Sequence, residues 1–161
     1  MKITAKDIAR WAELREAQGS LPRLVRRLAM QSGTITQLAF PAGESVSLPG
    51  WDGEILSSDG DAWVPKGKSC WELSVEANPT TKANRDYDKR TNKTPETVRR
   101  STTLVIVTAR RWSKKNAWRD EKLALCEWHS IRAYDADDLE AWLETVQKLN
   151  FLKTNTYRRY R

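Results

Sequence analysis

The chain has 161 residues, of which 39% are hydrophobic and 30% are charged. This length and balance predict one folded domain with a real core and argue against a disordered chain. The formal net charge of +7 and the pI near 9.6 favour a polyanionic partner, and nucleic acid is the commonest one. A generally basic protein without such a partner is the alternative.

Several classes of protein are disfavoured by the composition and by the N-terminal sequence. Two cysteines and one histidine are too few for a disulfide framework or for a zinc site built from Cys and His. The opening MKITAKDIARWAEL is charged throughout, which is not the pattern of a signal peptide. No apolar stretch reaches the length of a membrane span. The sequence therefore predicts a cytoplasmic protein without a membrane partner.

The first third of the chain predicts two helices. Residues 5–17 follow a T-x-x-D capping box, and Gly19 is expected to end this helix. Ser20 is then expected to cap a second helix that has Pro22 in its first turn.

Three strand-like segments follow, at residues 34–40, 50–56 and 69–76. The polar sequence between the second and third segments is typical of a hairpin connection. Polar and apolar residues alternate in the third segment, so Glu72, Ser74 and Glu76 are expected on one face of that strand.

The second half of the chain predicts alternating helices and strands. A helix is expected from residue 79 to about residue 90, and the apolar run 103–108 is typical of a strand buried on both faces. The remaining expected elements are a helix within 110–125, a strand at 130–134 and a final helix capped by Asp135 or Asp137. This order predicts an α/β fold with a mixed central sheet flanked by helices on both faces.

Acidic residues gather on the second and third predicted strands. Asp52 and Glu54 share a face of their strand, and Glu72 shares a face with Ser74 and Glu76. If the two strands pair as a hairpin, both acidic faces lie on one side of the sheet. Carboxylates crowded in this way repel one another unless a cation neutralises them. A divalent ion would supply that charge; an ordinary solvent-facing side of an antiparallel sheet is the alternative.

Lys82 is expected in the first turn of the helix that follows the third strand. The helix dipole disfavours a cation there, which favours a role for this position. Two structural explanations stay open, because Lys82 could be an exposed helix residue or could pair with Asp86 four positions later.

The element order and the pattern D…ExS…K resemble the PD-(D/E)XK nuclease superfamily, which has the restriction-endonuclease-like fold. The resemblance covers most of residues 20–146. In that superfamily an acid on the second strand and an E-x-K motif on the third bind the metal and water. Asp52 and Glu72 match the two acids, but Ser74 stands where the lysine is expected. Some members carry the lysine on the following helix, which Lys82 would suit.

The segments GWDGE, WELS and KANRDY are also similar to N-terminal nuclease domains of large bacterial defence proteins, including antiviral STAND-type ATPases. This similarity implies that residues 1–161 form a single nuclease-like domain from the N-terminal part of a longer protein. It further implies an effector in anti-phage defence that is active as a homo-oligomer.

The resemblance implies a Mg²⁺-dependent endonuclease that hydrolyses DNA phosphodiester bonds, with Mn²⁺ able to substitute. Asp52 and Glu72 would bind the metal, and the carbonyl of Leu73 could complete its ligands because backbone oxygens suit hard cations. Lys82 would position the attacking water or stabilise the developing negative charge. The second choices for the site are Glu54, Ser74 and Glu76.

DNA is expected to be contacted mainly through its phosphates, because no base-reading motif is evident. The basic side chains expected to hold phosphate are Arg85, Lys89 and Arg110. Two alternatives stay open: a ribonuclease of the same fold, and an inactive module of this fold that binds nucleic acid or a protein partner.

Overall fold

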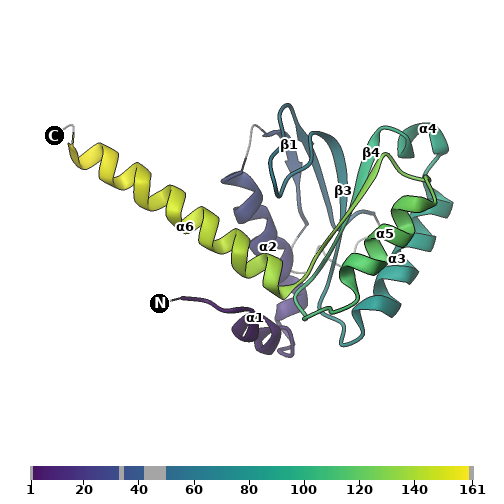
Figure 1. The fold of residues 1–161 in the computed structure, drawn as a ribbon, viewed down its shortest axis with the longest axis horizontal. Helices are drawn as coiled ribbons and strands as arrows, with labels where there is room; N and C mark the ends of the chain where they lie inside the picture. The colour runs from purple at the N-terminus through teal and green to yellow at the C-terminus, as the bar shows by residue number, and fades with distance from the viewer. Residues whose placement is uncertain (1, 33–34, 42–49, 160–161) are drawn as a thin grey trace.

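A five-stranded mixed sheet forms the centre of the computed structural model, which describes residues 2–32, 35–41 and 50–159 (Figure 1). In spatial order the strands are β1 (Ile35–Ala39), β2 (Gly53–Ser57), β3 (Gly67–Ser74), β4 (Thr102–Thr108) and β5 (Ser130–Tyr134). The pairs β1–β2 and β2–β3 are antiparallel, whereas β3–β4 and β4–β5 are parallel. The predicted mixed sheet is therefore confirmed.

Helices cover both faces of this sheet, as predicted. Their bounds are α1 (Ala5–Trp11), α2 (Ala17–Met30), α3 (Pro79–Lys93), α4 (Glu96–Arg99), α5 (Lys115–Ala124) and α6 (Ala136–Arg159). Helices α1, α2 and α6 lie on one side of the sheet, and α3 and α5 lie on the other (Figure 1). Within the described part of the chain, none of these helices combines the length and apolarity needed to cross a membrane.

The sheet divides the core into two halves, and β4 contributes buried side chains to both. All seven residues of β4 are buried, which confirms the strand predicted from the apolar run. Val105 and Val107 pack with α1, α2 and α6, while Leu104 and Ile106 pack with α3 and α5. Because successive residues of a strand point to opposite faces, one apolar run supports both helical layers.

The boundary between the first two helices differs from the prediction. Helix α1 keeps the predicted capping box of Thr4 and Asp7 but ends at Trp11, and α2 begins at Ala17 and continues through Gly19. A glycine inside a helix costs about 1 kcal/mol relative to alanine. Burial of Ala17 and Leu21, both fully inaccessible, offsets that cost, because the hydrophobic stripe of α2 begins before the glycine.

Other element ends shift by a few residues. Strand β2 begins at Gly53 instead of residue 50, so Asp52 belongs to the loop before the strand. Strand β3 ends at Ser74, and the short helix α4 was not expected. Residue 34, the first of the predicted opening strand, lies outside the described residues.

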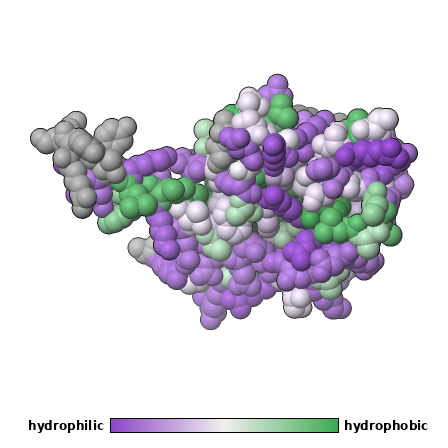
Figure 2. Space-filling model, turned by 45° about the horizontal axis from the view of Figure 1, so that its top comes forward, coloured by the Kyte–Doolittle hydropathy of each residue, from purple (hydrophilic) through white to green (hydrophobic). Residues whose placement is uncertain are grey.

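The second half of α6 extends away from the sheet and its helical layers (Figure 1). It carries the exposed apolar side chains Leu149, Phe151 and Leu152, which belong to the apolar patch on the projecting arm in Figure 2. Exposed apolar patches commonly mark contact surfaces. The homo-oligomer expected from the sequence stays a prediction. Substitutions on this arm would test whether it forms a contact between copies of the chain.

Gly53 allows β2 to lie against a buried aromatic ring. A Cβ at this position would overlap the ring of Phe40, which packs edge-on against Trp71 with ring centroids 5.9 Å apart. We expect Gly53→Ala to lower the free energy of unfolding by about 1–3 kcal/mol, since the ring must leave its place in the core. Urea denaturation measures this change. Leu56→Ala on the same strand is the control, because Leu56 is 40% exposed. Equal stability of the two variants would contradict this account.

Candidate active site

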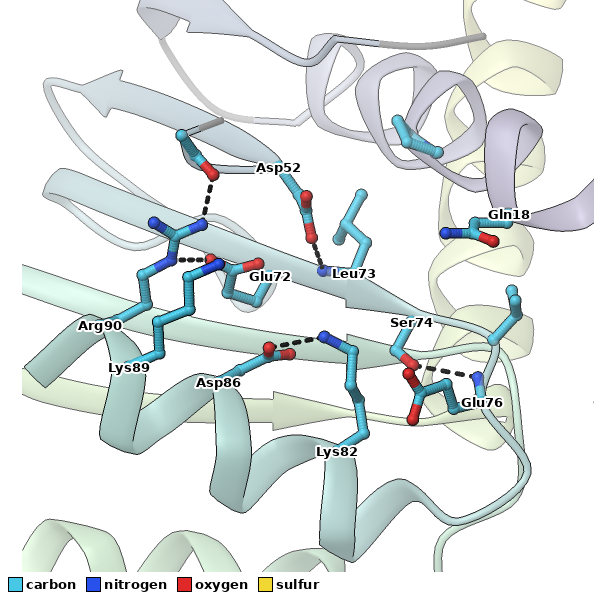
Figure 3. A pocket seen from close by; sticks show the side chains of 13 residues that line it. Gln18, Asp52, Glu72, Leu73, Ser74, Glu76, Lys82, Asp86, Lys89 and Arg90 are labelled. Carbon is cyan, nitrogen blue, oxygen red and sulfur yellow. Dashed lines mark hydrogen bonds and ion pairs between the residues drawn. The ribbon is translucent and has the colours of Figure 1, made fainter. Parts of the chain in front are cut away.

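A cavity of about 320 Å³ opens between the end of β3, helix α3 and the first turns of α2 (Figure 3). Its acidic wall residues are Asp52, Glu72, Glu76 and Asp86, and its basic ones are Lys82, Lys89 and Arg90. Gln18 and Pro22 line it from α2. The cavity therefore gathers charged groups from three separate parts of the chain.

The register of the sheet brings Asp52 and Glu72 together. Gly53 on β2 pairs with Trp71 on β3, so Asp52, one residue before Gly53, lies beside Glu72. Trp71 and Leu73 point into the core with α2 and α6, while Glu72 points to the opposite side, towards α3. The predicted alternation along β3 is confirmed.

Asp52 is held by the main chain of β3. The N–H of Leu73 donates a hydrogen bond of 2.8 Å to Oδ2 of Asp52. In an extended strand the N–H and C=O of one residue face the same neighbouring strand. The carbonyl of Leu73 therefore faces the side on which Asp52 lies, where β2 has not yet begun.

Glu72 is the most deeply buried acid of the cavity, with 4% of its surface exposed. Burial, a hydrogen bond with Asp52 and the charge of Asp52 together raise the pKa of Glu72 to about 8. Arg90 opposes this shift: its Nε donates to Oε1 of Glu72, and its positive charge lowers the pKa of that carboxyl. Asp52 is thus close enough to Glu72 to raise the pKa of the Glu72 carboxyl.

Lys82 reaches into the same cavity from α3. Its Nζ lies 2.6 Å from Oδ1 of Asp86, which is the i,i+4 pair that the sequence left open as an explanation. Burial raises the pKa of Asp86, whereas the hydrogen bond from Lys82 lowers it. Lys82 is therefore both a cavity residue and a partner of Asp86 (Figure 3).

The second-choice residues are distributed between this cavity and its surroundings. Ser74 and Glu76 line the cavity, and Oγ of Ser74 accepts a 3.0 Å hydrogen bond from the N–H of Glu76. Glu54 is exposed and lines a different hollow with β1 residues, so the structure does not bring it to Asp52 and Glu72.

The three predicted phosphate-binding residues occupy different environments. Lys89 lines the cavity, and the exposed Arg85 pairs with Glu76 at 2.7 Å. Arg110 is half-buried and donates through Nε to the carbonyl of Val75 at 2.8 Å. Lys89 therefore lines the cavity itself, whereas Arg85 and Arg110 each contact a residue of its wall.

Arg90 is a cavity residue that the sequence did not single out, and Asp86 was expected only as a possible partner of Lys82. Lys82, Asp86 and Arg90 follow one another at intervals of four on α3, so they share one face of the helix. That spacing is visible in the sequence once Lys82 is placed. The contact of Arg90 with Glu72 depends on how α3 docks on the sheet, and no sequence signal gives it.

Two of the acidic residues can supply part, but not all, of the ligand set of a divalent cation. Among the described residues, no three His, Cys, Asp or Glu side chains form a group that could hold a metal ion. Mg²⁺ commonly uses one or two carboxylates, keeps several waters and takes further oxygens from substrate phosphates. Asp52 and Glu72 are neighbouring carboxyl groups, and the charge of Asp52 raises the pKa of Glu72, so the pair fits this smaller ligand set.

Comparison of the chain with protein-family models, with curated proteins and with solved structures gives no match. The resemblance to the PD-(D/E)XK superfamily therefore stays a prediction from short motifs.

The raised pKa of Glu72 predicts how the stability of the metal-free protein depends on pH. Between its ordinary value of 4.5 and about 8, folded Glu72 keeps a proton that the unfolded chain has released. The folded state therefore loses stability as pH rises through this window. Asp52→Asn removes a cause of the raised pKa, so the loss between about pH 5 and about pH 8 should shrink.

Urea denaturation in the presence of EDTA measures this dependence. Glu54→Gln is the matched control, because Glu54 lies outside the cavity, and it should retain the parent's loss of stability. An identical pH dependence in the parent and Asp52→Asn would show that the two carboxyl groups do not interact.

Proposed function

We propose that this domain is a Mg²⁺-dependent endonuclease that hydrolyses DNA phosphodiester bonds, with Mn²⁺ as a substitute. The observation that supports this proposal best is the meeting of Asp52, Glu72 and Lys82 in one cavity. These residues come from a loop, a strand and a helix, and they are the same three that the D…ExS…K pattern of the sequence groups.

The two acids and the main chain of β3 would hold the metal. Asp52 uses one oxygen for the N–H of Leu73, and Glu72 uses one for Arg90, so each carboxylate has a second oxygen to offer. The carbonyl of Leu73 faces the same side and suits a hard cation. A bound Mg²⁺ would polarise a phosphoryl oxygen and lower the pKa of a bound water.

Lys82 would act on the reacting phosphate from the opposite wall. Its Nζ is held at 2.6 Å from Asp86, which fixes the long side chain instead of leaving it free in solvent. A cation held in this way stabilises negative charge that develops during hydrolysis. Lys89 and Arg85, near the cavity, would contact neighbouring phosphates.

The substrate and the biological setting belong to the same proposal. The net charge of +7 suits either DNA or RNA, so a ribonuclease of this fold is the nearest variant of the proposal. The setting implied by the motifs is an N-terminal effector in bacterial anti-phage defence, cytoplasmic and active as a homo-oligomer.

One observation favours a second function, an inactive module that binds nucleic acid or a protein partner. Glu72 already has a cation, Arg90, and Asp86 already has Lys82. Buried acids that are paired with side-chain cations do not require a metal for folding. Metal binding therefore separates the two functions.

A plasmid cleavage assay with and without EDTA, run beside an RNA substrate, tests the proposal. We expect Mg²⁺-dependent cleavage of DNA by the parent and at least a ~100-fold lower rate for Glu72→Gln, because the amide cannot supply a charged ligand. DNA binding should be kept or strengthened, since a negative charge near the phosphates is lost. Glu54→Gln should cleave like the parent. Cleavage by the parent in EDTA, or equal rates for Glu72→Gln and the parent, would refute the assignment.

Lys82→Ala tests the cation on the helix. We expect a rate reduced by about 10²–10³-fold, of the size seen when one charge-stabilising group is removed, with Mn²⁺ affinity largely kept. Lys93→Ala, an exposed lysine in the last turn of the same helix, is the matched control and should change the rate little. Normal cleavage by Lys82→Ala would end the proposal that the strand lysine is replaced from α3.

A further inference from the structure

Arg90 makes three contacts that together fix its guanidinium group over Glu72. Its Nε donates to Oε1 of Glu72, and its Nη2 donates to the carbonyl of Gly50. The guanidinium carbon also lies 4.5 Å from the centre of the Trp51 ring. Only 9% of Arg90 is exposed, so these contacts replace water around the charge.

The loop that receives Arg90 is shaped for this contact. Gly50 has a φ of 127°, a backbone conformation that other residues rarely adopt. Trp51 packs edge-on against Trp128, with ring centroids 6.0 Å apart, so the ring beneath the guanidinium is itself held. The loop leads directly into Asp52, the second acid of the cavity.

Arg90 therefore holds one oxygen of Glu72, next to the second oxygen that a divalent cation would use. Asp52 lies beside Glu72 in the cavity wall, and Arg90 is the side-chain cation in contact with Glu72. Two cations on one buried carboxylate repel each other strongly where water is largely excluded. Binding of a metal to Glu72 therefore weakens the contact of Arg90 with Glu72, and that contact weakens metal binding.

We propose that Arg90 is a positioning residue that holds Glu72 in the metal-free site and must leave Glu72 when a divalent cation binds. This inference rests on the proposed function, since it takes Asp52 and Glu72 as the metal ligands. Arg90 orders the site in the absence of metal and at the same time weakens metal affinity. The Gly50 carbonyl and the Trp51 ring retain the displaced guanidinium at the cavity wall.

A positioning role and a merely structural ion pair predict opposite changes in metal affinity. If Arg90 only stabilises the fold, its loss leaves metal affinity unchanged or lowers it by disordering the site. If Arg90 competes with the metal, its loss raises metal affinity. Lys89 supplies the matched control, because it is the preceding residue and also lines the cavity, whereas the contact with Glu72 is made by Arg90.

Isothermal titration with Mn²⁺ in the absence of nucleic acid measures the effect without any cleavage. We expect Arg90→Gln to bind Mn²⁺ about tenfold or more tightly than the parent, and Lys89→Gln to change the affinity by no more than about threefold. Arg90→Lys keeps the charge but lacks the planar fork that reaches Glu72 and Gly50 together, so its affinity should fall between those of the parent and Arg90→Gln. Thermal unfolding of each variant checks that it is folded.

A second measurement uses the parent protein and needs no variant to remain folded. The Nε–H resonance of Arg90 reports its hydrogen bond to Glu72 and can be followed by ¹⁵N NMR during titration with Mg²⁺. We expect this resonance to shift in step with the amide resonance of Leu73, whose N–H contacts Asp52.

The outcomes distinguish failure of this inference from failure of the proposed function. If the parent binds Mn²⁺ but Arg90→Gln binds no more tightly than Lys89→Gln, or if the Arg90 resonance stays fixed while that of Leu73 moves, the inference is overturned and the metal site stands. If neither the parent nor Arg90→Gln binds Mn²⁺, the metal site and the proposed function fail together. Tighter binding by Arg90→Gln, without cleavage by any variant, supports the inference and refutes the nuclease.

Discussion

A carboxyl group buried at the end of a central strand is the constraint on which the rest of this site depends. Glu72 lies on β3 between β2 and β4, where 4% of it reaches solvent, and Asp52 is placed beside it by the pairing of β2 with β3. Burying a charge without a partner is far more costly than burying an apolar group of the same size. This carboxyl must therefore keep a proton, as its raised pKa favours, or take positive charge from a neighbouring group.

Helix α3 supplies that charge, and tryptophan contacts fix the helix. Its charged row of Lys82, Asp86 and Arg90 faces the cavity at intervals of four residues. On the remaining surface of α3, indole N–H groups donate to polar side chains: Trp112 to Thr80, Trp118 to Asn84 and Trp128 to Thr91. These three bonds of 2.8–3.0 Å run along the length of the helix and set its rotation. These contacts belong to the second core, which lies between the sheet and helices α3 and α5. The side of α3 that faces the cavity, with Lys82, Asp86 and Arg90, is thus determined by contacts on the other side of the helix.

Features that depend on the periodicity of side chains within one strand could be predicted from the sequence. Contacts that depend on how a helix packs on the sheet could not. Alternation along β3 gave the face of Glu72, and the apolar run of β4 gave a strand buried on both sides, since both depend on side-chain periodicity alone. A break between α1 and α2 is present, but its predicted position at Gly19 was wrong because burial of Ala17 outweighs the helix-breaking tendency of Gly19. The contact of Arg90 with Glu72 spans 18 residues and depends on the rotation of α3, which no short-range pattern encodes.

Ser74 stands on β3 where the resemblance leads one to expect a lysine, so the strand itself supplies no cation at this position. Ser74 is buried and its hydroxyl accepts from the main chain of Glu76, so this residue helps to end β3. The cavity instead takes its cations from α3, where Lys82 is steadied by Asp86. A cation on a strand is oriented by the sheet itself, whereas a cation on a helix is oriented by whatever fixes the helix. The placement of these cations is therefore tied to the tryptophan contacts of the second core, and we expect substitutions there to move Lys82 and Arg90 together relative to Glu72.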